Sequence, residues 1–162
     1  MSKVNSALLA NRPARPKLVR LDAVDQRLLC DLVEDARTAN NVLASRAGVA
    51  PSTSLARIRR LEEAGVIKGY HADLDLGLLG LTVHALVQLR VQVHARPRML
   101  AVARQLRAEP NVLDVFLVGG DRDLVLHVVC ESADDLKTFI NEKIGTNTDL
   151  ANSTTSLVFE KL

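Results

Sequence analysis

The sequence predicts an α+β protein with two domains, a helical head followed by a tail with the element order β-α-β-β-α-β. Two helical patterns separated by Gly48 lie between Arg37 and Lys68. Residues 82–93, 112–118 and 123–130 are rich in β-branched residues and leucine, which is typical of strands. Amphipathic helical patterns lie between these strands and after them, which indicates the split βαββαβ order.

Composition excludes several classes of protein. The 162 residues are 48% hydrophobic and 25% charged, as in a globular protein with one domain or two small ones. No run of about 18 apolar residues predicts a membrane span, and the N-terminal apolar stretch is too short for a secretory signal. We therefore expect a cytoplasmic protein. Cys30 and Cys130 are expected to be buried thiols, and neither the cysteines nor the scattered histidines have metal-site spacing.

Three helices are predicted in the head. Asp22 is expected to cap a helix that runs to about Asp35, with Asp25 as the third residue of its first turn. Asn40 is expected to cap a second helix, which ends at Gly48 because glycine readily takes the positive φ of a tight turn. A third helix begins at Pro51, where the missing N–H costs nothing.

The third helix has the pattern of a DNA recognition helix. Leu55, Ile58 and Leu61 recur at helical spacing and are expected to face the core. Hydroxyls followed by arginines on the other faces suit phosphates and base edges in a major groove. An ordinary helical hairpin with a solvated basic face is the alternative. The predicted DNA contacts are Ser52, Thr53, Ser54, Arg57, Arg59, Arg60 and Lys68.

Charge and composition along the chain suggest its organisation. Residues 1–20 carry five bases and no acid and are predicted to be a flexible basic arm, which either touches DNA or is disordered. Residues 21–75 form the head, ending in a short wing strand over Val66–Ala72, and 76–82 form a hinge strand. The aromatic content of 2% is too low for base-stacking platforms, which favours duplex DNA over single strands.

The tail, residues 83–162, is expected to have a ferredoxin-like fold. Pro97 opens its first helix, Ser132 caps the second helix, which ends at Gly145, and Ser153–Phe159 form the last strand. In this arrangement both helices cover one face of an antiparallel sheet. The other face would be exposed although its strands are apolar, so we expect a second copy to cover it and to form a homodimer.

The chain from Leu21 to Leu162 resembles the leucine-responsive/asparagine-type (Lrp/AsnC) family of transcription regulators. The resemblance is carried by LDAVDQRLLCDLVEDAR, by LASRAGVAPSTSLARIRRLEEAGVIKGYHADLD, and by the turn Gly120-Asp121-Arg122-Asp123 before a strand. It implies dimers that assemble further, often into octamers, and a small effector, usually an amino acid. We expect no cofactor. It places the effector at the turn between the second and third tail strands: Val118, Gly119, Gly120, Asp121, Arg122 and Asp123.

Alternatives remain for this turn and for the function. Glycine and aspartate are also favoured in a plain hairpin turn, for backbone reasons alone. Arg122, a position often uncharged in the family, keeps open an anionic effector such as a keto acid, and Ala50 replaces a Ser or Thr helix cap. An architectural DNA-binding protein without an effector is the second interpretation. An enzyme using Asp114, Asp121 and Asp123 is disfavoured, since no nucleophile–base pair accompanies them.

Overall fold

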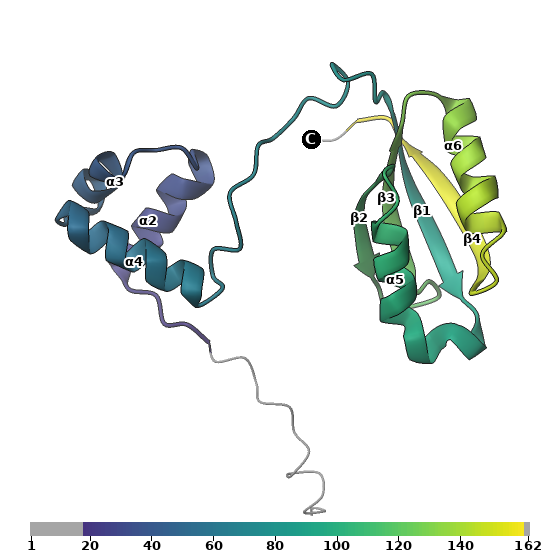
Figure 1. Cartoon of the computed structure of the whole chain (residues 1–162), viewed down its shortest axis with the longest axis horizontal. Helices are drawn as coiled ribbons and strands as arrows, with labels where there is room; N and C mark the ends of the chain where they lie inside the picture. Colours follow the sequence, from purple (N-terminus) through teal and green to yellow (C-terminus); the bar gives the residue numbers. More distant parts are fainter. Residues whose placement is uncertain (1–17, 161–162) are drawn as a thin grey trace, which may run out of the picture. The chain divides into compact units, whose positions relative to one another are not determined.

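The structure, a computed structural model, describes residues 18–160, so most of the predicted basic arm lies outside the described residues. The chain divides into two compact units at Asp73/Leu74. Figure 1 shows helices alone in the first unit and a sheet with helices in the second. Within residues 18–160, no helix combines the length and the apolar character that a membrane crossing requires.

The head consists of α2 (Ala23–Glu34), α3 (Asn40–Ala47) and α4 (Pro51–Glu63). The predicted Asp22 cap of α2 is confirmed, and the structure shows a reciprocal capping box: the Asp25 N–H donates to Asp22, and the Asp22 N–H donates to Asp25. Gly48 ends α3 with a φ of 69°, as the tight turn requires. The apolar core of the head is formed by Leu28, Leu43, Ala47 and Ile58.

Four expectations for the head and hinge were wrong. Asn40 lies inside α3 and its side-chain amide donates to the Pro51 carbonyl, so it ties two helices together instead of capping one. Residues 66–72 form no strand, because the Val66 and Ile67 N–H groups both bond the Leu61 carbonyl at the end of α4. The hinge, 76–82, contains turns instead of a strand. Cys30 is exposed, whereas Cys130 is buried as expected.

The tail has the predicted ferredoxin-like topology. Its strands are β1 (Val83–Val91), β2 (Val112–Leu117), β3 (Leu124–Cys130) and β4 (Leu150–Val158), arranged in the order β2-β3-β1-β4 with antiparallel pairing. The helical segments are a 3₁₀ turn, η1 (Val93–Arg98), then α5 (Met99–Arg107), and later α6 (Ala133–Phe139), which continues as a π-helical turn, η2 (Ile140–Gly145). Ser132 caps α6 as predicted.

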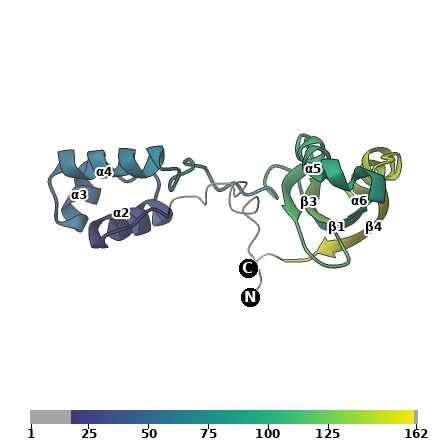
Figure 2. The ribbon, with the colours of Figure 1, turned by 90° about the horizontal axis from the view of Figure 1, so that it is seen from below.

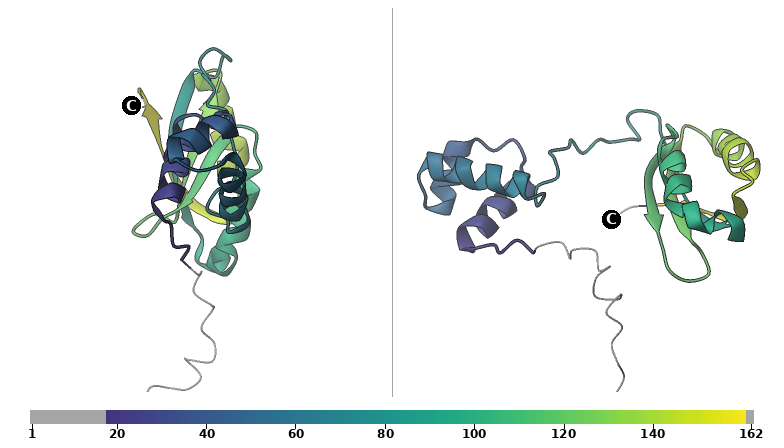
Figure 3. Two further views of the ribbon diagram at one scale, coloured as in Figure 1. Left: turned by 90° about the vertical axis from the view of Figure 1, so that its left-hand side faces the viewer. Right: turned by 60° about the horizontal axis from the view of Figure 1, so that its bottom comes forward.

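Both helices of the tail cover the same face of the sheet, as Figures 2 and 3 show. That face carries alternate residues of the central strands, among them Val87 on β1 and Leu126 on β3, which are fully buried. The intervening residues of β1, β2 and β3 point to the opposite face, which no helix of the tail covers. The structure therefore shows the exposed sheet face that the strand pattern predicted.

Candidate DNA-binding surface and effector loop

Helix α4 is held by its buried side, and its outer side is exposed. Ser54, Ile58 and Leu61 are buried, whereas Ser52, Thr53 and Arg59 are exposed. Two parts of our prediction for α4 were therefore wrong. Ser54, expected to contact DNA, faces the core, and Leu55, expected in the core, is exposed. The physical reason is that residues 54, 58 and 61 form a tighter helical stripe than 55, 58 and 61.

Two of the predicted DNA-contacting arginines are paired within the head. Arg57 Nη1 lies 2.6 Å from Asp22 Oδ2 and 3.0 Å from Asp25 Oδ1. Arg60 Nη2 lies 2.5 Å from the other oxygen of Asp25. These contacts join α4 to the first turn of α2. In contrast, Arg59 and Lys68 have no hydrogen-bond or ion-pair partner within residues 18–160 and are exposed.

The same contacts lower the pKa of both carboxyl groups. Burial alone would raise the pKa of Asp25, but the hydrogen bonds from the Asp22 N–H, Arg60 and Arg57 outweigh it, so the pKa lies below its usual value. The pKa of Asp22 is lowered by the Asp25 N–H and then by Arg57. A carboxyl group with a lowered folded-state pKa stabilises the fold above its unfolded pKa, and this stabilisation is lost as the pH falls through the folded value.

We therefore expect the head to be fully stabilised by these pairs at neutral pH and to lose that stabilisation as the pH falls below 3.8. The Asp25→Asn variant should be less stable by about 1–3 kcal/mol at pH 7, because it loses charge-assisted hydrogen bonds. The stability of Asp25→Asn should also fall less than that of the wild type between pH 7 and pH 2.5. Thermal melting followed by circular dichroism between pH 7 and pH 2.5 measures both effects. Parallel pH profiles for the two proteins would contradict the assignment.

The predicted effector loop connects β2 to β3 at the end of the sheet that also carries η1 (Figures 1 and 3). The Val118 N–H donates to the Asp123 carbonyl and closes the hairpin, which leaves 119–122 as the loop. Gly119, Gly120 and Asp121 are exposed. Arg122 lies against the sheet, where its Nη1 donates to Asn152 on β4 at 2.7 Å.

Asp123 has a structural role that the sequence did not indicate. Its carboxylate oxygen accepts a 2.8 Å hydrogen bond from the Val91 N–H, where the register of β1 against β4 shifts. Arg96 of η1 lies 3.9 Å from the other carboxylate oxygen. Arg98 and His94, also on η1, contact Asp149 just before β4. Of the three acidic or basic side chains of 121–123, Asp121 is thus the one most open to a ligand.

Because Asp123 satisfies a backbone N–H at a strand irregularity, we expect Asp123→Ala to lower the free energy of unfolding of the tail by about 1–3 kcal/mol. The matched control is Asp121→Asn, because the carboxylate of Asp121 lies two residues away and is exposed. This control should change the free energy of unfolding by less than about 0.5 kcal/mol. Urea unfolding of the full chain provides the measurement. Equal stability of the two variants would show that the Val91 contact contributes nothing.

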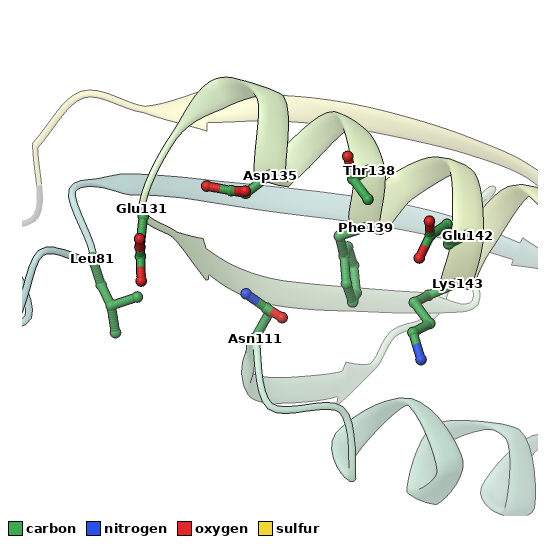
Figure 4. A pocket seen from close by; sticks show the side chains of 8 residues that line it. All are labelled: Leu81, Asn111, Glu131, Asp135, Thr138, Phe139, Glu142 and Lys143. Carbon is green, nitrogen blue, oxygen red and sulfur yellow. The ribbon is translucent and has the colours of Figure 1, made fainter.

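The tail also contains a cavity of about 370 Å³ that is separate from this loop. Figure 4 shows Phe139 projecting from the α6 helix into it, with Lys143 beside it and Glu131 at the far end. Glu131 follows the last residue of β3, whereas the effector loop precedes the first, so the cavity lies at the other end of that strand. Within residues 18–160, no cluster of three metal-ligating side chains occurs in this cavity or elsewhere.

Comparison with known proteins decides the family. Residues 21–68 match the family described as winged helix-turn-helix DNA-binding, and residues 84–162 match the Lrp/AsnC ligand binding domain. The HTH-type transcriptional regulator AldR of Mycolicibacterium smegmatis is 39% identical over all of this chain and 96% of its own length. The chain belongs to the Lrp/AsnC family of transcriptional regulators. It is a DNA-binding regulator with a ligand-binding domain, not an enzyme.

Other members of the Lrp/AsnC family confirm the assignment. The leucine-responsive regulatory protein of Rhizobium meliloti is 31% identical over 89% of this chain and 92% of its own. A transcriptional regulator from Neisseria meningitidis, solved as a complex with L-Met, is 26% identical with a TM-score of 0.80, over 88% of this chain and 92% of that one. The α+β fold predicted from the sequence is thus the fold of solved family members.

Proposed function

We propose that this protein is an effector-responsive regulator that binds duplex DNA as a homodimer, with α4 of each head in a major groove. The observation that carries the proposal is the exposed outer side of α4, where Ser52 and Thr53 lie in the first turn and Arg59 lies two turns later. Hydroxyls and N–H groups at a helix N-terminus suit phosphates, and a guanidinium suits guanine or phosphate. Lys68 supplies a further cation after the helix. We propose that the protein acts in the cytoplasm, as its DNA-binding regulator relatives support.

The exposed sheet face supports the homodimer. Phe116 on β2 is 53% exposed, and Leu86 on β1 is also exposed. The register puts Phe116 opposite Val125 and Leu86 opposite His127, so these side chains share one face. Packing this face against a second copy would remove its apolar side chains from water. Two heads in one dimer would then reach grooves about 34 Å apart, which favours a pseudo-palindromic site.

The β2–β3 loop is the proposed effector site. The Gly119 and Gly120 N–H groups and Arg122 suit a carboxylate, and Asp121 suits an α-ammonium group. The L-Met complex of the Neisseria meningitidis relative supports an amino acid, while Arg96 and Arg122 near this loop also suit a keto acid. We place the effector where two dimers meet, as expected for an assembly larger than a dimer, such as an octamer.

A thermal-shift screen of amino acids and branched keto acids tests the effector proposal. An effector present at 100 times its Kd should stabilise the protein by about 2.7 kcal/mol. An architectural protein without an effector, the competing interpretation, predicts no stabilisation by any metabolite. A completely negative screen at millimolar concentrations would therefore favour the architectural interpretation.

The Asp121→Ala variant tests the loop itself. Asp121 is exposed, and among the described residues its one ion pair is with the adjacent Arg122 at 3.7 Å, so the variant should fold and bind DNA as the wild type does. Removal of the ammonium acceptor should cost an amino acid about 1.5–3 kcal/mol of binding, or at least a tenfold weaker affinity. The affinity is measured by titration calorimetry with the amino acid found in the screen. An unchanged affinity would remove Asp121 from the site.

A further inference from the structure

The charge network between α2 and α4 has a role beyond joining the two helices. Asp25 is 1% exposed, and its two oxygens accept from Arg57, Arg60 and the Asp22 N–H. Asp22 Oδ2 forms the second contact of Arg57. Two carboxylates therefore balance two guanidiniums. Of the three arginines of α4, only Arg59 is left without a partner in the part of the chain that the structure describes.

The two paired arginines are not free to move to DNA phosphates. The side chain of Arg57 is 28% exposed, and its two contacts are both to carboxylates. Arg60 is more exposed, but a move to a phosphate would leave one oxygen of the buried Asp25 without its cation. Removing one partner from a buried ion pair leaves an uncompensated charge, which is strongly unfavourable. The pairs should therefore persist when the head binds DNA.

We infer that Asp22 and Asp25 determine DNA specificity by holding Arg57 and Arg60 away from the phosphates, so that Arg59 is the arginine with which α4 reads DNA. Sequence-independent affinity rises with each phosphate that a cation neutralises. Two retained arginines per head therefore lower the affinity for arbitrary DNA, while contacts to base edges are unaffected. The inference rests on the proposed position of α4 in the major groove.

The Asp22→Asn variant of the full-length protein provides the test. Asparagine caps helices as well as aspartate does, so α2 should be retained while the nearer of the two carboxylates that hold Arg57 loses its charge. The probes are a duplex selected from a random pool by the wild-type protein and a scrambled duplex of the same composition. Binding to both is measured as a function of salt. Glu34→Gln, the same charge change at the other end of α2, is the control.

We expect Asp22→Asn to bind the scrambled duplex more tightly and to steepen the salt dependence on it. Each released arginine that reaches a phosphate should add about 0.9 to the slope of log K against log salt, or about 1.8 for a dimer. The ratio of selected to scrambled affinity should fall, whereas Glu34→Gln should leave the slope unchanged. Asp25→Asn should act in the same direction by releasing Arg60, whose ion pair is with Asp25.

Two results would overturn the inference. One is a folded Asp22→Asn variant whose salt-dependence slope and whose ratio of selected to scrambled affinity both equal those of the wild type. The other is an equal loss of affinity for both duplexes with an unchanged slope, which a purely structural role predicts. If Asp25→Asn does not fold, Asp22→Asn decides alone, since Asp22 is on the surface. If α4 does not lie in the major groove at all, a different result is expected: Arg59→Gln would then leave binding to both duplexes unchanged.

Discussion

Replacing Arg59 by glutamine is expected to weaken binding of the selected duplex by at least about 30-fold. Arg59 is exposed and unpaired on the outer side of α4. One arginine contact to a base is worth about 1–3 kcal/mol, and a dimer loses two such contacts, so the loss is about 2–6 kcal/mol. Fluorescence anisotropy with a labelled duplex measures the affinity. The melting temperature should change little, because the side chain is exposed and forms no hydrogen bond or ion pair within residues 18–160.

A control separates this contact from a simple loss of charge. Arg104 is an exposed arginine of α5 in the other unit, so Arg104→Gln removes the same charge from a domain to which we assign no DNA contact. We expect this variant to bind the selected duplex almost as the wild type does. If Arg59→Gln and Arg104→Gln weaken binding equally, net charge explains the effect, and the assignment of α4 as the recognition helix is wrong.

Leu86→Asp is expected to convert the protein to a monomer and, as a consequence, to reduce DNA affinity by more than 100-fold. Leu86 lies in the middle of β1 on the exposed face, beside His127 of β3. Taking a carboxylate out of water between two apolar sheet faces would cost several kcal/mol in each subunit. Loss of the dimer leaves each head to bind one half-site alone, without the gain in effective concentration that the second head provides. Sedimentation velocity measures the assembly.

Leu78→Asp is the matched control, since Leu78 is an exposed leucine that lies in the hinge segment instead of the sheet. This variant should keep the assembly of the wild type. A dimeric Leu86→Asp protein would contradict the proposal that the exposed face joins two copies. The circular dichroism spectrum of Leu86→Asp should equal that of the wild type, because Leu86 points away from the core of the tail.

Local patterns predicted most of the fold. Ser132 and the Asp22–Asp25 capping box were identified because a cap depends on residues three positions apart. The strands of the tail were identified because their apolar content is continuous over several residues. The wing strand was wrong because residues 66–72 alternate like a strand, but the Val66 and Ile67 N–H groups bond the Leu61 carbonyl at the end of α4 instead of a neighbouring strand.

The details of the two surfaces were less predictable. Leu55 was assigned to the core because it is apolar, yet the packing of α4 turns Ser54 inward instead. The contacts of Asp25 with Arg57 and Arg60 span 32 and 35 positions of the chain. The contact of Asp123 with Val91 spans 32 positions. No local pattern encodes such pairs, so the sequence assigned Arg57, Arg60 and Asp123 to ligands and Asp25 to the first turn of α2 alone.

The central claim is that the head binds duplex DNA while the tail sheet joins two copies. The assembly formed on a duplex tests this claim most directly. The measurement is sedimentation velocity of the full-length protein with a selected duplex that carries two half-sites about 34 Å apart. Two chains joined through the sheet should bind as one unit at low salt and dissociate from the duplex as the salt concentration rises. A protein that sediments as a monomer and leaves the duplex unshifted at low salt would contradict the account.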